Sequence, residues 1–203
     1  MRDTSRIALV LSALTAIALL DGTHAESDLL TRTLSASDLG RLAQFAKARA
    51  DSIAEAREKG DPAEVAELDA MLSGDEQQIL GLDIRGDYRC RVAKTGAKDE
   101  GLLPLVVYDW FRCRIGEDDI GYRLEKTSGS QRLSGHFIDD SATSLVFYGA
   151  AHYDYEELRE YGSDPERDVV GRFVKVGDDR FRLEMPLPTS ESTFDILELE
   201  ERG

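Results

Sequence analysis

The chain has 203 residues, and its 40 acidic residues outnumber its 25 basic residues, which gives a formal net charge of −15. Such a charge repels nucleic acid and anionic lipid, so the composition argues against both as partners. The acidic residues are spread along the chain instead of forming one tract, which is typical of a solvated surface. The length suits one domain with a substantial hydrophobic core.

The first 25 residues predict a secretory signal peptide. Two arginines precede an apolar run over residues 7–20, and Thr23 and Ala25 occupy the −3 and −1 positions of a cleavage site. The run is short for a membrane-spanning helix, which needs about 20 residues. We therefore expect a periplasmic or secreted protein that is cleaved after Ala25 and has no integral membrane segment afterwards.

The segment over residues 26–82 predicts a helical hairpin. Ser35 begins a capping box, and the apolar residues that follow recur at helical spacing until Gly60. Asp61 then serves as the N-cap of a second helix, with Pro62 at its first position. We expect this N-terminal helical hairpin to pack on the main domain of the chain.

The pattern changes to strands in the predicted main domain, over residues 83–203. Most of the candidate strands are joined by short turns, which favours an antiparallel meander. Its simplest closed form is an eight-stranded up-and-down β-barrel, which leaves no edge exposed, and a two-layer β-sandwich is the alternative. The predicted fold class is α+β. The candidate strands are 86–94, 104–115, 121–126, 131–138, 144–149, 169–176, 180–185 and 193–200.

One connection, over residues 150–168, is far longer than a hairpin needs. Long connections in compact domains are usually functional or disordered. This one carries Tyr153, Tyr155 and Tyr161 among acidic residues. It is either a lid over one end of a barrel or a surface helix anchored by its tyrosines.

Cys90 and Cys113 are the two cysteines of the chain, and each lies between two arginines, in "YRCR" and "FRCR". In an oxidising compartment two thiols are expected to form a disulfide. A metal site is not expected, because His136 and His152, the two histidines beyond the signal peptide, show no ligand spacing. No sequence feature indicates a cofactor.

Strand alternation separates the cysteines from the residues beside them. The cysteines share an apolar face, and the other face carries Arg89, Arg91, Trp110, Arg112 and Arg114. A simple hairpin with Cys90 opposite Cys113 places Arg91 opposite Arg112 and Arg89 opposite Arg114. Like charges directly across a sheet are destabilising, so we expect something negative among these arginines.

Two interpretations of the arginine face remain open. Carboxylates of the chain itself, from Glu125, Glu198 or Glu200, provide internal ion pairs in the first interpretation. In the second, the four arginines and Trp110 bind a small anionic or amphipathic ligand.

The sequence holds no recognisable catalytic motif. It lacks a nucleophile elbow, and neither cysteine has a predicted histidine neighbour. We therefore expect a binding protein without catalytic residues. The alternative is a cell-envelope interaction module that contacts another protein through the helical hairpin or the 150–168 loop.

Four stretches resemble a bacterial family of exported proteins, domain of unknown function 4893, over most of the chain after the signal peptide. These are "GDYRCRVAK" (86–94), "YDWFRCRI" (108–115), "LEKTSGSQRLSG" (124–135) and "LELE" (197–200), and the paired R-C-R segments are the most specific of them. No activity is established for that family, so the resemblance implies no catalytic residues. A fainter similarity to lipocalin-type barrels lies in Gly86-Asp87-Tyr88, where lipocalins have Gly-x-Trp, and it too implies a barrel.

Overall fold

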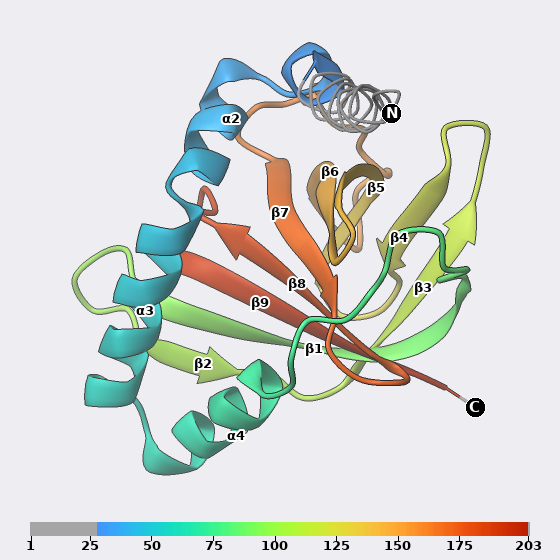
Figure 1. The fold of residues 1–203 in the computed structure, drawn as a ribbon. Coiled ribbons are helices and arrows are strands. Elements are labelled where there is room, and N and C mark those ends of the chain that lie inside the picture. The colour runs from blue at the N-terminus through green and yellow to red at the C-terminus, as the bar shows by residue number, and fades with distance from the viewer. Residues whose placement is uncertain (1–27, 203) are drawn as a thin grey trace, which may run out of the picture. The chain divides into compact units, whose positions relative to one another are not determined.

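A computed structural model describes residues 28–202 of the chain. The chain divides into two compact units, residues 1–34 and residues 35–203, and residues 28–33 of the first unit are helical. The predicted signal peptide and its cleavage site lie outside the described residues. The second unit contains the elements discussed below (Figure 1).

Three helices open the second unit: α2 (Ala36–Ala43), α3 (Phe45–Lys59) and α4 (Pro62–Leu72). The predicted caps are confirmed, because the hydroxyl of Ser35 accepts a hydrogen bond from the Asp38 amide and the Asp61 carboxylate accepts one from the Ala63 amide. The predicted first helix is instead two helices. The amide of Gln44 donates to the carbonyl of Arg41, three residues back, and this tight turn ends α2 before α3 begins.

Nine antiparallel strands follow, and eight of them close into a barrel through pairing between β1 and β9. The predicted barrel is thus confirmed and the sandwich alternative is not. The predicted strand 104–115 is two strands, and the shorter of them, β2, pairs with β1 outside the ring. The strands are β1 (Gly86–Ala97), β2 (Leu105–Val107), β3 (Phe111–Glu117), β4 (Tyr122–Lys126), β5 (Gln131–Ser141), β6 (Ser144–Tyr153), β7 (Asp168–Lys175), β8 (Arg180–Pro186) and β9 (Ser192–Glu201).

The predicted disulfide is confirmed, but the predicted register is wrong. Cys90 and Cys113 are bonded, with their Cα atoms 5.8 Å apart. Cys113 lies opposite Tyr88, however, and Cys90 lies opposite Phe111, so the bond joins diagonal positions instead of facing ones. A diagonal pair is still within the Cα separation that a disulfide spans.

The register error has a physical cause in the β1–β2–β3 connection. Ala93 pairs with Val107 on β2, whereas Cys90 pairs with Phe111 on β3, so two residues of β1 face three residues of the other chain segment. The predicted register requires Ala93 to face Trp110, so the turn between β1 and β2 displaces β2 by three residues, and the extra residue before β3 reduces this displacement to two. As a result Arg89, and not Arg91, lies opposite Arg112.

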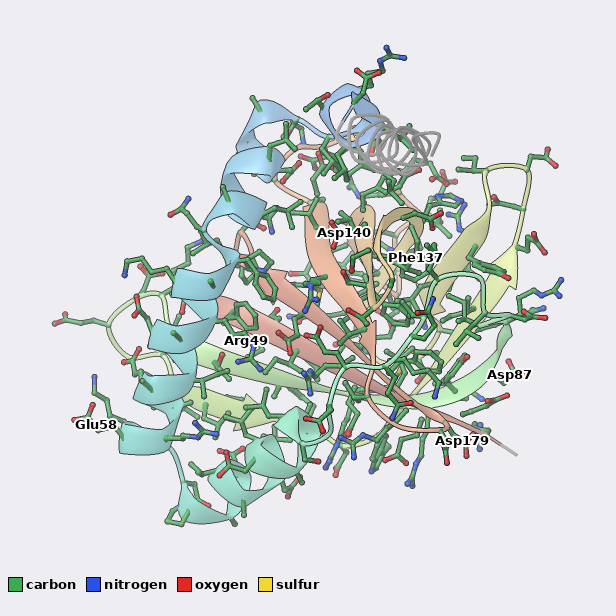
Figure 2. All side chains as sticks on the ribbon, in the orientation of Figure 1. Arg49, Glu58, Asp87, Phe137, Asp140 and Asp179 are labelled. Carbon is green, nitrogen blue, oxygen red and sulfur yellow. A yellow bond between two sulfur atoms is a disulfide. The ribbon has the colours of Figure 1, made fainter. Side chains whose placement is uncertain are left out.

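Two apolar layers hold the second unit together. The first fills the barrel, where Phe137 is among the side chains that point inward, and the second lies between the helices and the outside of the barrel (Figure 2). Helix α3 packs against β1, β8 and β9, α4 packs against β2, and α2 packs against β7. On the outer side of the barrel Arg49 reaches from α3 to the carboxylate of Glu184, 2.7 Å away.

One end of the barrel is closed by the segment between α4 and β1. Ile79 and Ile84 of this segment are buried in the barrel core. The amide of Ile79 donates to the Ala142 carbonyl, and Gln77 forms a bridge with Lys175. We call this the plugged end and the opposite one, where β1 ends and β9 begins, the open end.

The long connection between β6 and β7 contains no helix. It is anchored by Tyr161, whose hydroxyl donates to the carboxylate of Asp38 at 2.6 Å and accepts a hydrogen bond from the amide of Ser35. Tyr155 is 80% exposed and takes no part in this anchor. The predicted surface helix is therefore wrong, although a tyrosine does anchor the connection, and a role as a lid stays a prediction.

The disulfide provides the first testable prediction. It closes a loop with a sequence separation of 23 residues, for which chain entropy predicts a loss of about 3 kcal/mol when the bond is removed. The Cys90→Ala/Cys113→Ala variant should lose about that free energy of unfolding in urea denaturation. Reductant should destabilise the wild type to a similar extent and leave the variant unchanged. Equal stability of the two proteins without reductant would contradict the prediction.

Candidate functional site

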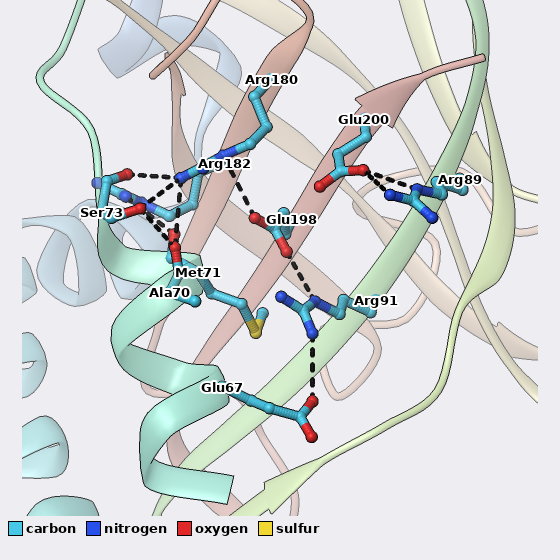
Figure 3. Close-up of polar contacts among 10 residues, drawn as sticks. All are labelled: Glu67, Ala70, Met71, Ser73, Arg89, Arg91, Arg180, Arg182, Glu198 and Glu200. Atoms are coloured by element: carbon cyan, nitrogen blue, oxygen red, sulfur yellow. Dashed lines mark hydrogen bonds and ion pairs between the residues drawn. The ribbon is translucent and has the colours of Figure 1, made fainter.

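The predicted arginine face lies on the outside of the barrel, and two of its four arginines, Arg89 and Arg91, are ion-paired. In the β1–β9 register Arg89 faces Glu200 and Arg91 faces Glu198, with Nε to carboxylate distances of 2.7 Å in both pairs (Figure 3). Arg91 also donates to Glu67 of α4 at 3.2 Å. Two of the three carboxylates named by the ion-pair interpretation, Glu198 and Glu200, are therefore in place.

Trp110 completes this outer face. Its ring lies 4.2 Å from the guanidinium carbon of Arg89 and 4.7 Å from that of Arg91. Arg112 and Arg114 are exposed and have no carboxylate within 4 Å among the described residues. Arg114 borders an open depression whose wall carries twice as many acidic as basic side chains. Ligand binding at this face stays a prediction.

A cavity of about 330 Å³ lies at the open end of the barrel. Because Cys90 faces the barrel core, strand alternation turns Val92 and Lys94 inward as well. Corresponding positions of the other strands complete an apolar wall. Its members are Val92, Phe111, Leu133, Val169 and Met185.

The charges around this cavity differ from those of the whole chain. Five basic residues line it against two acidic ones, in a protein whose net charge is −15. A wall of low polarity strengthens the field of such a group, so the cavity attracts anions. The basic residues are Arg41, Lys94, Lys126, Arg132 and Arg167, and the acidic residues are Asp168 and Asp195.

Lys126 is the most buried of the lysines in this wall, with 5% of its surface exposed. Its ammonium donates to the carbonyls of Ser128 and Gln131 at 2.9 and 2.7 Å and lies 3.7 Å from the centre of the Phe111 ring. Burial lowers the pKa of Lys126 to about 8, and the neighbouring charges of Arg132 and Lys94 act in the same direction. Lys126 thus adds positive charge to the cavity, while its own donors are already occupied.

Arg41 reaches the cavity from α2 and is 9% exposed. Its Nη1 donates to the Asp38 carboxylate at 2.8 Å and to the Asp168 carbonyl at 2.9 Å, and its Nε donates to the Pro186 carbonyl at 3.3 Å. Its Nη2 is buried without a hydrogen-bond partner among the described residues. The guanidinium is therefore fixed in place with one donor group unused.

Asp195 lies inside the barrel, opposite Lys94 in the β1–β9 register. Its Oδ1 accepts a hydrogen bond from the hydroxyl of Ser192. Burial raises the pKa of Asp195 to about 6, although Ser192 and the positive charge of Lys94 oppose the shift. At neutral pH the cavity therefore holds a largely ionised carboxylate at an energetic cost.

The sequence contained a signal for part of this site. Lys94 is in phase with Cys90 and Val92, so the alternation that places the cysteine inside also places the lysine inside. Asp195 likewise alternates with outward residues of β9. Arg41 had no such signal, because helix α2 is remote in sequence from every strand that it meets.

A family model described as "Domain of unknown function (DUF4893)" matches residues 31–199. The chain belongs to this family. The match covers α2–α4, most of β9 and every strand between them, which confirms the resemblance seen in the R-C-R segments. No curated protein and no solved structure matches the chain. The similarity to lipocalins stays a prediction.

Two further properties concern only residues 28–202. Within this range, no cluster of three or more His, Cys, Asp or Glu side chains has a geometry that could hold a metal ion. Within the same range, no helix is both long enough and apolar enough to cross a bilayer.

The two interpretations of the outer face predict different effects of mutation. Glu198 is 2% exposed, so Arg91→Gln leaves a buried carboxylate whose remaining ion-pair partner among the described residues is Arg180, and it should lower the free energy of unfolding by about 2 kcal/mol. The matched control, Arg112→Gln, should change it by less than about 0.5 kcal/mol. Urea denaturation measures both. If Arg91→Gln leaves stability unchanged, the ion-pair account of this face is wrong.

A second prediction concerns Asp195 and pH. Its pKa in the folded protein, about 6, lies above its usual value of 3.8, so the ionised carboxylate destabilises the fold above pH 6 and this penalty disappears as pH falls below about 4. Asp195→Asn should therefore raise the free energy of unfolding by about 2–3 kcal/mol at pH 7.5 and hardly at all at pH 3.5. Urea denaturation at both pH values tests this. The exposed control, Asp119→Asn, should show no such difference, and an equal effect of Asp195→Asn at both pH values would refute the assignment.

Proposed function

We propose that this protein is an exported, non-enzymatic binding protein that holds a small anionic or amphipathic ligand in the cavity at the open end of its barrel. The observation that carries the proposal is an apolar cavity with five basic residues in its wall, in an otherwise acidic protein. Apolar pockets with a few convergent polar groups are the usual form of small-molecule sites.

The size of the cavity limits the ligand. Its volume, about 330 Å³, is near the lower end of the range of roughly 300–1,000 Å³ that ligand pockets occupy. A ligand of the size of a short aromatic or aliphatic acid fits this space, with its apolar part against residues such as Phe111 and Leu133. A complete membrane lipid is too large to be enclosed.

Binding without turnover is supported by the wall of the cavity. Nucleophilic catalysis needs a hydroxyl or thiol within hydrogen-bond reach of a base. Among the described residues that line the cavity, no hydroxyl is hydrogen-bonded to His152, whose Nδ1 has no partner there.

Export is supported by the signal-peptide pattern over residues 1–25 and by the disulfide, which is typical of oxidising compartments. Intact mass spectrometry of the protein recovered from a bacterial periplasm should show a chain that begins at Glu26 with both cysteines bonded. A full-length chain confined to the cytosol would contradict this part of the proposal.

The binding proposal is tested with 3-phenylpropanoate, L-phenylalanine and hexanoate as small amphipathic probes in isothermal titration calorimetry. At least one should bind the wild type. Ala151→Phe, which places a ring inside the cavity, should weaken that binding by about tenfold or more. The control Ala66→Phe adds the same ring on the exposed side of α4 and should have no effect.

The same titrations distinguish the cavity from the outer arginine face. If Arg112→Gln abolishes binding while Ala151→Phe preserves it, the ligand lies on the outer face and the cavity proposal fails. If no probe binds the wild type, the proposed function fails as a whole.

A further inference from the structure

Arg41 is the cavity residue with a fixed position and an unused hydrogen-bond donor, which makes it the strongest candidate for a contact with a ligand. Three hydrogen bonds, to Asp38, Asp168 and Pro186, hold its Nη1 and Nε. Its Nη2 is buried and has no partner among the described residues, although the side chain lines the cavity. A buried charged donor without a partner is energetically unfavourable, and an acceptor on a ligand removes that cost.

The surroundings of Arg41 keep this donor in position. The Asp38 carboxylate that binds Arg41 also accepts hydrogen bonds from the hydroxyls of Ser35 and Tyr161, at 2.7 and 2.6 Å. Tyr161 belongs to the long loop between β6 and β7, so the loop and α2 together orient the guanidinium. Such preorganisation lowers the entropy that a ligand loses on binding.

Lys126 is a poorer candidate for the same contact. An ammonium group has three donors, and those of Lys126 are directed to two backbone carbonyls and the Phe111 ring. Lys94 is partly occupied too, because its ammonium is paired with Glu191 and bonded to the side chain of Gln131. Both lysines contribute to the field of the cavity, whereas Arg41 contributes an available donor.

Asp195 adds a negatively charged group to a cavity wall in which basic residues predominate. The charges of both Arg41 and Lys94 act on its carboxylate, which places it within electrostatic reach of both. Its Oδ1 is bonded to Ser192, and its Oδ2 has no hydrogen-bond partner among the described residues. An ionised acceptor in the wall repels a second carboxylate and attracts an ammonium or hydroxyl donor.

We propose that the ligand is a small zwitterion with an apolar side chain, of the α-amino acid class, whose carboxylate binds Nη2 of Arg41 and whose ammonium binds the carboxylate of Asp195. This inference rests on the proposed function, because it assumes that the cavity is the ligand site. The apolar wall, with Phe111, Leu133 and Met185, receives the side chain. The volume of about 330 Å³ suits a ligand of this size.

Three probes with the same aromatic ring separate the two charged contacts. L-phenylalanine carries both charges, 3-phenylpropanoate lacks the ammonium and 2-phenylethylamine lacks the carboxylate. In calorimetric titrations of the purified protein at pH 7.5, phenylalanine should bind at least about tenfold more tightly than either analogue, which corresponds to about 1.4 kcal/mol.

The outcomes separate this inference from the proposed function. If 3-phenylpropanoate binds as tightly as phenylalanine or more tightly, the zwitterion inference is overturned while binding of an amphipathic anion stands. If 2-phenylethylamine binds most tightly, the contact with Arg41 is overturned. If none of the three binds, and hexanoate does not bind either, both proposals fail.

Variants test the two contacts individually. Asp195→Asn should reduce the preference for phenylalanine over 3-phenylpropanoate to within about threefold, because it removes the partner of the ammonium. Arg41→Lys should weaken binding of both acids by about tenfold or more and leave the weak affinity for 2-phenylethylamine unchanged. The outer-face control, Arg112→Gln, should match the wild type. An unchanged preference in Asp195→Asn, with its fold verified by urea denaturation, would overturn the assignment of Asp195.

Discussion

The pairing of β1 with β9 is the constraint on which the rest of the second unit depends. It closes the barrel, and one register decides the surroundings of both faces of β1. On the outside it places Arg89 and Arg91 beside glutamates of β9. On the inside it places Lys94 beside Asp195. A shift of one residue along this pair would exchange the two faces, so the ion pairs and the cavity are specified together.

Several charged groups on the outside of the barrel are paired with one another, whereas those at the open end are only partly paired. On the outside, Arg91 and Glu198 neutralise one another, and Glu67 and Arg180 add to the same network (Figure 3). At the open end of the barrel, Arg41 keeps an unused donor and Asp195 remains ionised at an energetic cost. Natural proteins tolerate such costs mainly at sites where they serve binding or catalysis, which supports the proposal that a ligand binds in the cavity.

Much of the fold was predictable, but the candidate site was not. Helix caps at Ser35 and Asp61 and the alternation of the strands are local patterns, and both were confirmed. The arginines beside the two cysteines predict a site on the outer face. The alternation that turns Lys94 toward the inside of the barrel indicates the cavity instead. The position of Arg41 at the cavity could not be predicted from the sequence, because it depends on contacts with Asp168 and Pro186, which are more than a hundred residues away.

The sequence by itself determined that helices precede the strands, the order of the barrel strands, the disulfide partners and the apolar side of each barrel strand, because these follow from short-range periodicity and from the presence of two cysteines. Only the tertiary structure decided the offset of β3 along β1, the ion pairs of Arg89 and Arg91, and the position of Arg41 at the cavity. Each of these depends on how separate segments of the chain come together, and the first is set by where the turn between β1 and β2 reverses and by the extra residue between β2 and β3.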